Sequence, residues 1–107
     1  MQNRTKALNL LGLCERAGKM VSGVDIVLAS LKSKKVKVVI LANDSHADPC
    51  GKVTRVAKQN DVTVIDDFSS DEISHAVGKN RKVLGITDTG FGKALIQKIH
   101  KGVWFDD

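Results

Sequence analysis

The sequence predicts an α/β fold, a three-layer α/β/α sandwich around a central mixed sheet of about four strands. Helical patterns alternate with short apolar segments along the whole chain, without a linker or a repeat. The apolar segments are too continuous for one-sided strands, and strands covered on both faces need helices in two outer layers. At 107 residues, we expect one domain spanning 1–107 that buries its own core.

The first helix is predicted over residues 4–17, where apolar residues recur at helical spacing. Gly18 suits the left-handed position that closes a helix. Gly12, inside this helix, costs roughly 1 kcal/mol against alanine. Close packing on a neighbouring element would explain its presence.

The second helix is predicted to begin at Ser22 and to run to about Ser33. Ser22 would cap it, and Asp25, three residues on, completes a capping-box-like pair near the positive end of the helix dipole. A lysine cluster follows, and residues 36–42 form a strand that is apolar apart from Lys37.

The second half of the chain continues the alternation. Asp48 and Pro49 mark the start of a helix that extends to residue 60, and residues 62–65 form a β-branched strand. A helix opened by residues 69–72 ends at Gly78, and residues 83–87 give the next strand.

The last helix begins at Asp88 or Thr89, either of which can cap it. Leu95 faces the core, and Gly102 closes the helix. Residues 103–105 are then either a final strand or an apolar tail folded back on the domain.

The net charge of +5 favours a polyanionic partner, because phosphate neutralisation drives sequence-independent affinity for nucleic acids. Aromatic residues make up only 4%, so RNA would be read by shape and groove edges rather than by stacked bases. No apolar run reaches membrane-spanning length and the polar start is no signal peptide, which predicts a cytoplasmic protein without a membrane partner. Cys14 and Cys50 are expected to be reduced thiols.

Candidate catalytic and metal-binding patterns are weak. Residues 90–93, Gly-Phe-Gly-Lys, hint at a phosphate loop but lack its glycine spacing and the Ser/Thr after the lysine. Residues 50–55 resemble a cysteine phosphatase loop, but four residues rather than five separate Cys50 from Arg55. The three histidines lack metal-ligand spacing. We therefore expect no catalysis, no cofactor and no metal.

Topology offers a stronger indication of function. Loops at the carboxyl ends of strands gather at one edge of an open α/β sheet, and the loop over residues 43–48 would lie there. Residues 18–25 and 74–81 could reach the same edge only with suitable strand directions. Our functional expectation is that these segments meet and form a positively charged, preformed surface.

Three segments together resemble the kink-turn RNA-binding ribosomal protein family, which includes archaeal large-subunit and eukaryotic snoRNP core proteins. They read Ala-Gly-Lys-Met-Val-Ser-Gly, Lys-Val-Val-Ile-Leu-Ala-Asn-Asp and Ala-Val-Gly-Lys-Asn-Arg. The likeness spans nearly the whole chain, in order, and points to the short bacterial YlxQ-like branch. It implies a three-layer sandwich with an RNA surface at the second helix start, the loop after Asn43 and Asp44, and the loop around Gly78.

The family's second helix reads Gly-x-Asn-Glu-x-x-Lys, whose polar side chains reach the sheared G·A pairs of a bent internal loop. Gly23 matches its glycine, whereas Asp25 replaces the asparagine, Ile26 the glutamate and Ala29 the lysine. Aspartate lacks the amide donors, and isoleucine cannot accept hydrogen bonds from guanine. Basic residues are retained better than base-reading ones, which favours general or altered RNA binding, because phosphate contacts position and base contacts specify.

These observations predict a non-catalytic, monomeric, ribosome-associated protein that binds structured, kink-turn-like RNA such as rRNA. The alternative is a protein-interaction module on the same fold, with RNA binding weakened by the Ile26 and Ala29 changes. A small phosphate-ester enzyme using Cys50 or Lys93 is the third hypothesis. The expected RNA-contacting residues are Lys19, Ser22, Gly23, Asp25, Ile26, Ala29, Lys34, Lys35, Lys37, Asn43, Asp44, His46, Val77, Gly78, Lys79 and Arg81.

Overall fold

Helices and strands alternate in the computed structural model, as the sequence predicts. It describes the backbone of residues 3–44 and 48–100 and the side chains of residues 5–44 and 51–98. His46, Gly102 and residues 103–105 lie outside the described residues, so the predictions for them stay predictions. The elements are α1 (Asn3–Arg16), β1 (Met20–Ser22), α2 (Val24–Lys32), β2 (Val38–Ala42), α3 (Asp48–Gln59), β3 (Thr63–Phe68), α4 (Ser70–Val77), β4 (Val83–Ile86) and α5 (Thr89–His100).

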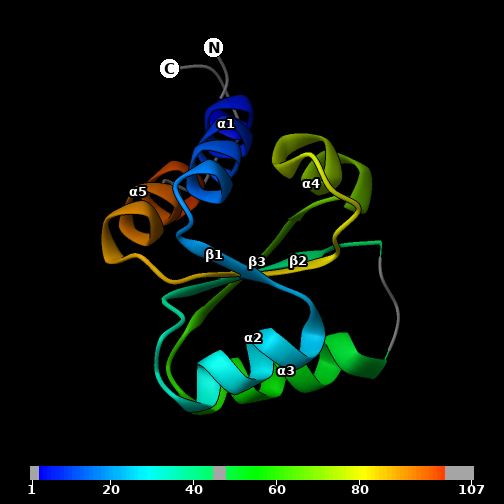
Figure 1. The fold of residues 1–107 in the computed structure, drawn as a ribbon, viewed down its shortest axis with the longest axis vertical. Helices are drawn as coiled ribbons and strands as arrows, with labels where there is room; N and C mark the ends of the chain where they lie inside the picture. The colour runs from blue at the N-terminus through cyan, green and yellow to red at the C-terminus, as the bar shows by residue number, and fades with distance from the viewer. Residues whose placement is uncertain (1–2, 45–47, 101–107) are drawn as a thin grey trace.

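The sheet has four strands in the order β1-β4-β2-β3. β2 and β3 are parallel, and β4 runs antiparallel to both β1 and β2. Helices α1, α4 and α5 cover one face of the sheet, and α2 and α3 cover the other (Figure 1). The predicted three-layer sandwich with a mixed sheet is confirmed.

Two apolar clusters sandwich the sheet, and β2 contributes to both. Val38, Ile40 and Ala42 belong to the cluster under α1, α4 and α5, while Val39 and Leu41 belong to the one under α2 and α3. All five residues of β2 are buried. Successive side chains of a strand point to opposite faces, which explains why a central, two-sided strand reads as a continuous apolar run.

The predicted helix ends are largely confirmed. Gly18 adopts a left-handed conformation (φ 71°) after α1, and Gly78 does the same (φ 74°) after α4. At the start of α4, Ser69 Oγ accepts from the Glu72 backbone N–H at 3.2 Å, while Glu72 Oε1 accepts from the Ser69 N–H at 3.0 Å. This reciprocal capping box satisfies two donors that the first turn leaves free.

The predicted cap at Ser22 is wrong. Ser22 ends the short strand β1, and Gly23 precedes α2 with a φ of 98° and no side-chain cap. Only glycine adopts such a backbone readily, so Gly23 turns the chain from the edge strand into the helix. The Ser22 hydroxyl instead accepts a hydrogen bond from Arg81 Nε at 3.0 Å.

Two further expectations were resolved by local geometry. Asp88, rather than Thr89, caps α5, because its Oδ2 accepts from the Phe91 backbone N–H at 2.9 Å. A Cβ on Gly12 would lie 2.8 Å from the Ala76 carbonyl oxygen, so α1 and α4 pack closely at this glycine.

Within the described residues, no helix has the length and apolar character needed to cross a bilayer.

Candidate functional site

Strand direction brings several loops to one edge of the sheet. β1, β2 and β3 all end there, and β4, which is antiparallel to β1 and β2, begins there. In Figure 1 this edge holds the start of α2 and the connection between α4 and β4. We call the surface made by residues 22–25, 43–44, 69–71 and 77–82 the loop edge.

Backbone hydrogen bonds fix the segments of the loop edge to one another. Gly23 N–H donates to the Val83 carbonyl at 3.0 Å, and Ala42 N–H donates to the Lys82 carbonyl at 2.9 Å. Asn43 N–H donates to the carbonyl of Phe68 at 2.9 Å. The segments around Gly23 and Gly78 therefore lie on the same side of the molecule, and their predicted convergence is confirmed.

Hydrogen bonds hold the side chain of Arg81 in the loop edge. Its Nε donates to Ser22 Oγ at 3.0 Å, and its Nη1 donates to the Asn80 carbonyl at 3.0 Å. Its backbone N–H donates to Ser74 Oγ at 3.1 Å, which ties the loop back to α4. The guanidinium is therefore held in a defined position, and the described residues use two of its five N–H donors.

Asp44 joins the loop after β2 to the start of α4. Its two carboxylate oxygens accept from the Ser70 backbone N–H at 3.0 Å and from the Ser70 hydroxyl at 2.9 Å. These hydrogen bonds lower the pKa of the Asp44 carboxyl below its usual value. Asn43 beside it is exposed.

The start of α2 presents side chains outward. Asp25, Ile26 and Ala29 are exposed, and Ile26 keeps 56% of its surface accessible. In the described part of the chain, Gly23 provides no side-chain cap to the first turn, whose N–H groups therefore remain available to an anion. Val77, by contrast, is buried in the core and cannot present its side chain to a ligand.

The charge of the loop edge differs from the expectation. Among its described residues, three carboxylates (Asp25, Asp44, Asp71) balance three cations (Lys79, Arg81, Lys82). Lys79 also pairs with Glu15 of α1 at 2.8 Å. The edge is preformed and polar, but the expected excess of positive charge is not found in its described part.

Four lysines predicted for this surface lie at the opposite edge. Lys19 precedes β1 and its carbonyl accepts from Thr87 N–H at 3.0 Å, and Lys37 N–H donates to the Ile86 carbonyl at 2.7 Å. Both contacts are made at the carboxyl end of β4, away from the loop edge. We call the surface made by Lys19, Lys34, Lys35, Lys37 and Lys93 the lysine edge.

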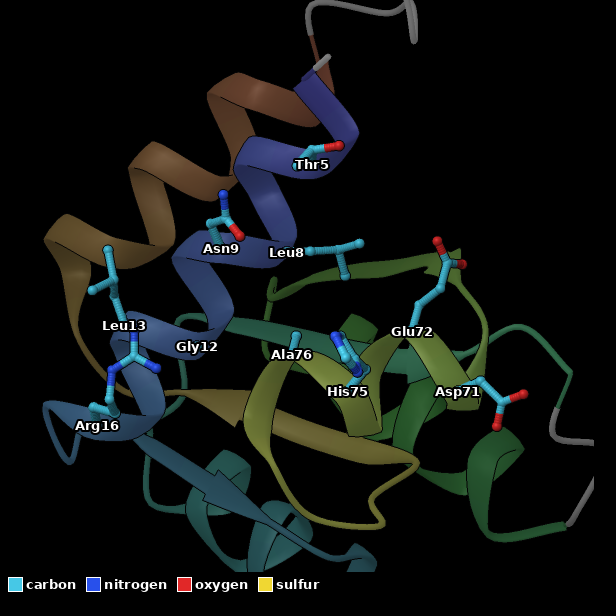
Figure 2. Close-up of a pocket in the computed structure, with 10 residues that line it drawn as sticks. All are labelled: Thr5, Leu8, Asn9, Gly12, Leu13, Arg16, Asp71, Glu72, His75 and Ala76. Atoms are coloured by element: carbon cyan, nitrogen blue, oxygen red, sulfur yellow. The ribbon is translucent and has the colours of Figure 1, made fainter. Parts of the chain in front are cut away.

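A groove between α1 and α4 was not predicted. It encloses about 740 Å³, with Arg16 near one end and Asp71 and Glu72 near the other (Figure 2). Leu13, half exposed, lines it together with Gly12. The sequence held one signal for it, the helical Gly12 whose presence close packing would explain, but the groove itself depends on how two distant helices pack.

Comparisons with known proteins agree with this geometry. Residues 5–96 match the family described as ribosomal protein L7Ae/L30e/S12e/Gadd45. RNA-binding protein YlxQ of Enterococcus faecium is 42% identical over 91 residues, covering 85% of this chain and 88% of that protein. RNA-binding protein YlxQ of Bacillus subtilis (strain 168) is 35% identical over 88 residues, covering 81% and 88%.

Two solved structures share the fold. A Bacillus halodurans protein of unknown function superposes with a TM-score of 0.84 at 29% identity, over 88% of this chain and 96% of that one. The Giardia lamblia 15.5 kD RNA-binding protein superposes with a TM-score of 0.74 at 19% identity, over 92% of this chain and 86% of that one. At this identity the second likeness concerns the fold alone.

Proposed function

The chain belongs to the ribosomal protein L7Ae/L30e/S12e/Gadd45 family, and on this premise we propose that it is a non-catalytic RNA-binding protein whose loop edge contacts structured RNA. The names of its two YlxQ relatives, both RNA-binding proteins, support this proposal. The observation that carries it is the hydrogen-bonded meeting of Gly23, Arg81 and Asn43 at one edge.

The loop edge offers complementary contacts to an RNA backbone. The uncapped first turn of α2 supplies free N–H donors to a phosphate, and the fixed Arg81 guanidinium supplies charged donors beside them. Because Ser22 Oγ and the Asn80 carbonyl already hold the Arg81 guanidinium, little side-chain entropy is lost on binding. The exposed Asn43 amide can both donate to and accept from a base edge.

We infer a structured, kink-turn-like internal loop in ribosomal RNA as the target, in the cytoplasm, with the protein acting as a monomer. Two features modify the family contact. Asp25 stands on the exposed start of α2 and repels phosphate, and Ile26 offers an apolar surface in place of an acceptor. Such a surface packs against a base or ribose without recognising guanine. The protein should therefore tolerate more RNA sequences than it would with a glutamate at this position.

The direct test is RNA binding by the full chain, measured by fluorescence anisotropy. The probes are a hairpin with an internal loop of tandem G·A pairs and the same hairpin fully paired. Arg81→Gln should weaken binding to the first roughly tenfold to a hundredfold, because hydrogen bonds to charged groups contribute about 1.5–3 kcal/mol. Lys52→Gln, on the exposed surface of α3, is the matched control.

The possible results separate the hypotheses. Absence of RNA binding by the parent protein at low salt would refute the proposal. Unchanged affinity in a folded Arg81→Gln protein would place the contact away from the loop edge. Capture of specific proteins from a nuclease-treated lysate, with no RNA affinity, would instead favour a protein-interaction module.

A further inference from the structure

The lysine edge is a compact cluster held by the end of β4. The backbones of Lys19 and Lys37 form hydrogen bonds with Thr87 and Ile86, from the two sides of the end of β4. The two lysine backbones therefore lie roughly 10 Å apart, which is about two strand spacings. Lys34 turns the chain in a left-handed conformation (φ 62°), and the Lys35 N–H donates to the Ser30 carbonyl at 2.9 Å. Two connections, one between α1 and β1 and one between α2 and β2, are thereby anchored around one surface.

Lys93 joins the same cluster from α5. A Cβ on Gly92, its neighbour, would lie 3.3 Å from Lys37 Cβ and 3.2 Å from Val38 Cγ2. The start of α5 therefore packs directly against the start of β2. Because Gly92 allows this approach, Lys93 is brought beside the lysines of the α2–β2 connection.

The positive charge of the lysine edge is not neutralised within the described part of the chain. All five lysines are exposed, and none of them forms an ion pair there. Asp61 lines the same depression as Lys34 and Lys37, and the Asp88 carboxylate, at the start of α5, already accepts from the Phe91 N–H. Within the described residues, these five lysines therefore carry an excess of positive charge that the balanced loop edge lacks.

The two edges act independently in physiological salt. Lys37 and Asn43 are separated by the length of β2, roughly 20 Å at about 3.3 Å per residue. This separation exceeds the Debye length of about 8 Å at physiological ionic strength. The lysine edge therefore contributes little to the attraction of RNA to the loop edge. Its charge acts only on a partner that lies against the lysine edge itself.

The composition of the lysine edge favours phosphate over a protein or a lipid surface. The large exposed apolar side chains of the described residues are Leu13, in the groove beside α4, and Ile26, at the start of α2. Neither belongs to the lysine edge, and the depression of about 260 Å³ there is lined mainly by polar groups, including Lys34, Lys37 and Asn60. Stable protein interfaces need an apolar core and membrane-binding surfaces an apolar anchor, whereas phosphate contacts need only positive charge.

We propose that the lysine edge is a second RNA-contacting surface, so that the protein holds two RNA segments at opposite ends of its sheet. This inference rests on the proposed function of the loop edge and extends it. The loop edge selects a structured site, and the lysine edge holds a neighbouring segment through its phosphates without reading its sequence. The protein then acts as a spacer of fixed length between two parts of a folded RNA.

The first test measures how affinity for a plain 20-base-pair RNA duplex depends on salt, in the full chain. Lys35→Gln/Lys37→Gln should lower the slope of log K against log salt by about 1.8, because each lost duplex contact removes about 0.9. Lys52→Gln/Arg55→Gln removes the same charge from α3 and should leave the slope unchanged. Equal slopes for the two double variants would overturn the inference.

The second test measures bridging. A donor-labelled hairpin with tandem G·A pairs and an acceptor-labelled plain duplex are mixed with the parent protein, and energy transfer between them is expected. Lys35→Gln/Lys37→Gln should abolish the transfer while the hairpin alone still binds. Failure of the parent protein to bind either RNA would refute the proposed function. Binding of the hairpin without energy transfer would refute only the second surface. The second surface would also be refuted if Lys35→Gln/Lys37→Gln lost its affinity for poly-glutamate but kept its affinity for RNA.

Discussion

Gly12→Ala tests whether α1 and α4 are packed as closely as the structure indicates. The new methyl group would lie 2.8 Å from the Ala76 carbonyl oxygen, well inside ordinary contact distances of 3.4–4 Å. The obstacle is a backbone atom, so no side chain can rotate away and one helix must shift. Overpacking of this kind costs about 1–3 kcal/mol, and the higher helix propensity of alanine returns about 1 kcal/mol. We expect a net destabilisation of about 0–2 kcal/mol.

Gly51→Ala supplies the matched control. Gly51 also lies inside a helix, but a Cβ there would meet none of the described atoms within 4 Å. This variant should therefore be more stable than the parent by up to about 1 kcal/mol, from helix propensity alone. The difference between the two variants, about 1–3 kcal/mol, isolates the contact with Ala76.

The assay is urea unfolding followed by far-UV circular dichroism, with the midpoint and the slope fitted for the parent and both variants. A lower midpoint for Gly12→Ala with an unchanged slope reports a loss of stability rather than a change in the unfolded state. If Gly12→Ala stabilised the protein as much as Gly51→Ala, the two helices would not be in contact there and our reasoning would be refuted.

Three further predictions concern single side chains. Burial raises the pKa of the Cys14 thiol to about 11, from 9.0. In a Cys50→Ser background, Cys14 should therefore react with a thiol reagent at pH 8 roughly 100-fold more slowly in native buffer than in urea. Equal rates in the two solvents would contradict this. This shift also contributes stability below pH 9 that is lost as the pH rises toward 11. The hydrogen bonds from Ser70 lower the pKa of the Asp44 carboxyl, so this group stabilises the fold above its unfolded pKa of 3.8 and ceases to do so as the pH falls through its folded pKa. Asp44→Asn should therefore narrow the difference between the urea midpoints measured at pH 6 and at pH 3. An unaltered difference would count against the Asp44–Ser70 contact. Ser69→Ala should cost about 0.5–2 kcal/mol in urea unfolding by removing the cap of α4, a loss that an unchanged midpoint would disprove.

The architecture was predictable because most of its elements carry local signals. β2 reads as a continuous apolar run, and the capping box from Ser69 to Glu72 and the left-handed Gly78 define α4 by sequence alone. β1 was missed for a physical reason. Three residues are too few to show a two-residue alternation, and the Ser22–Asp25 spacing imitates a helix cap that the backbone of Gly23 does not allow.

The candidate site was predictable only in part, because strand direction is not encoded locally. The convergence of Gly23 and Gly78 follows from β4 being antiparallel to its neighbours, and the same arrangement sends Lys19 and Lys37 to the far edge. Composition gave the net charge of the chain but could not show which surface carries it. The engagement of Arg81 by Ser22, residues 59 apart in sequence, lies equally beyond any local pattern.

The position of β4 has a consequence for synthesis. Among the strands that the structure describes it is the last to be made, yet it lies between β1 and β2, and β1 pairs with no other described strand. A nascent chain therefore cannot complete its sheet until residues 83–86 have left the exit tunnel, and apolar surface on β2 stays open until then. Protease resistance should accordingly arise in one late step of translation, and chains stalled before Val83 should be bound by chaperones.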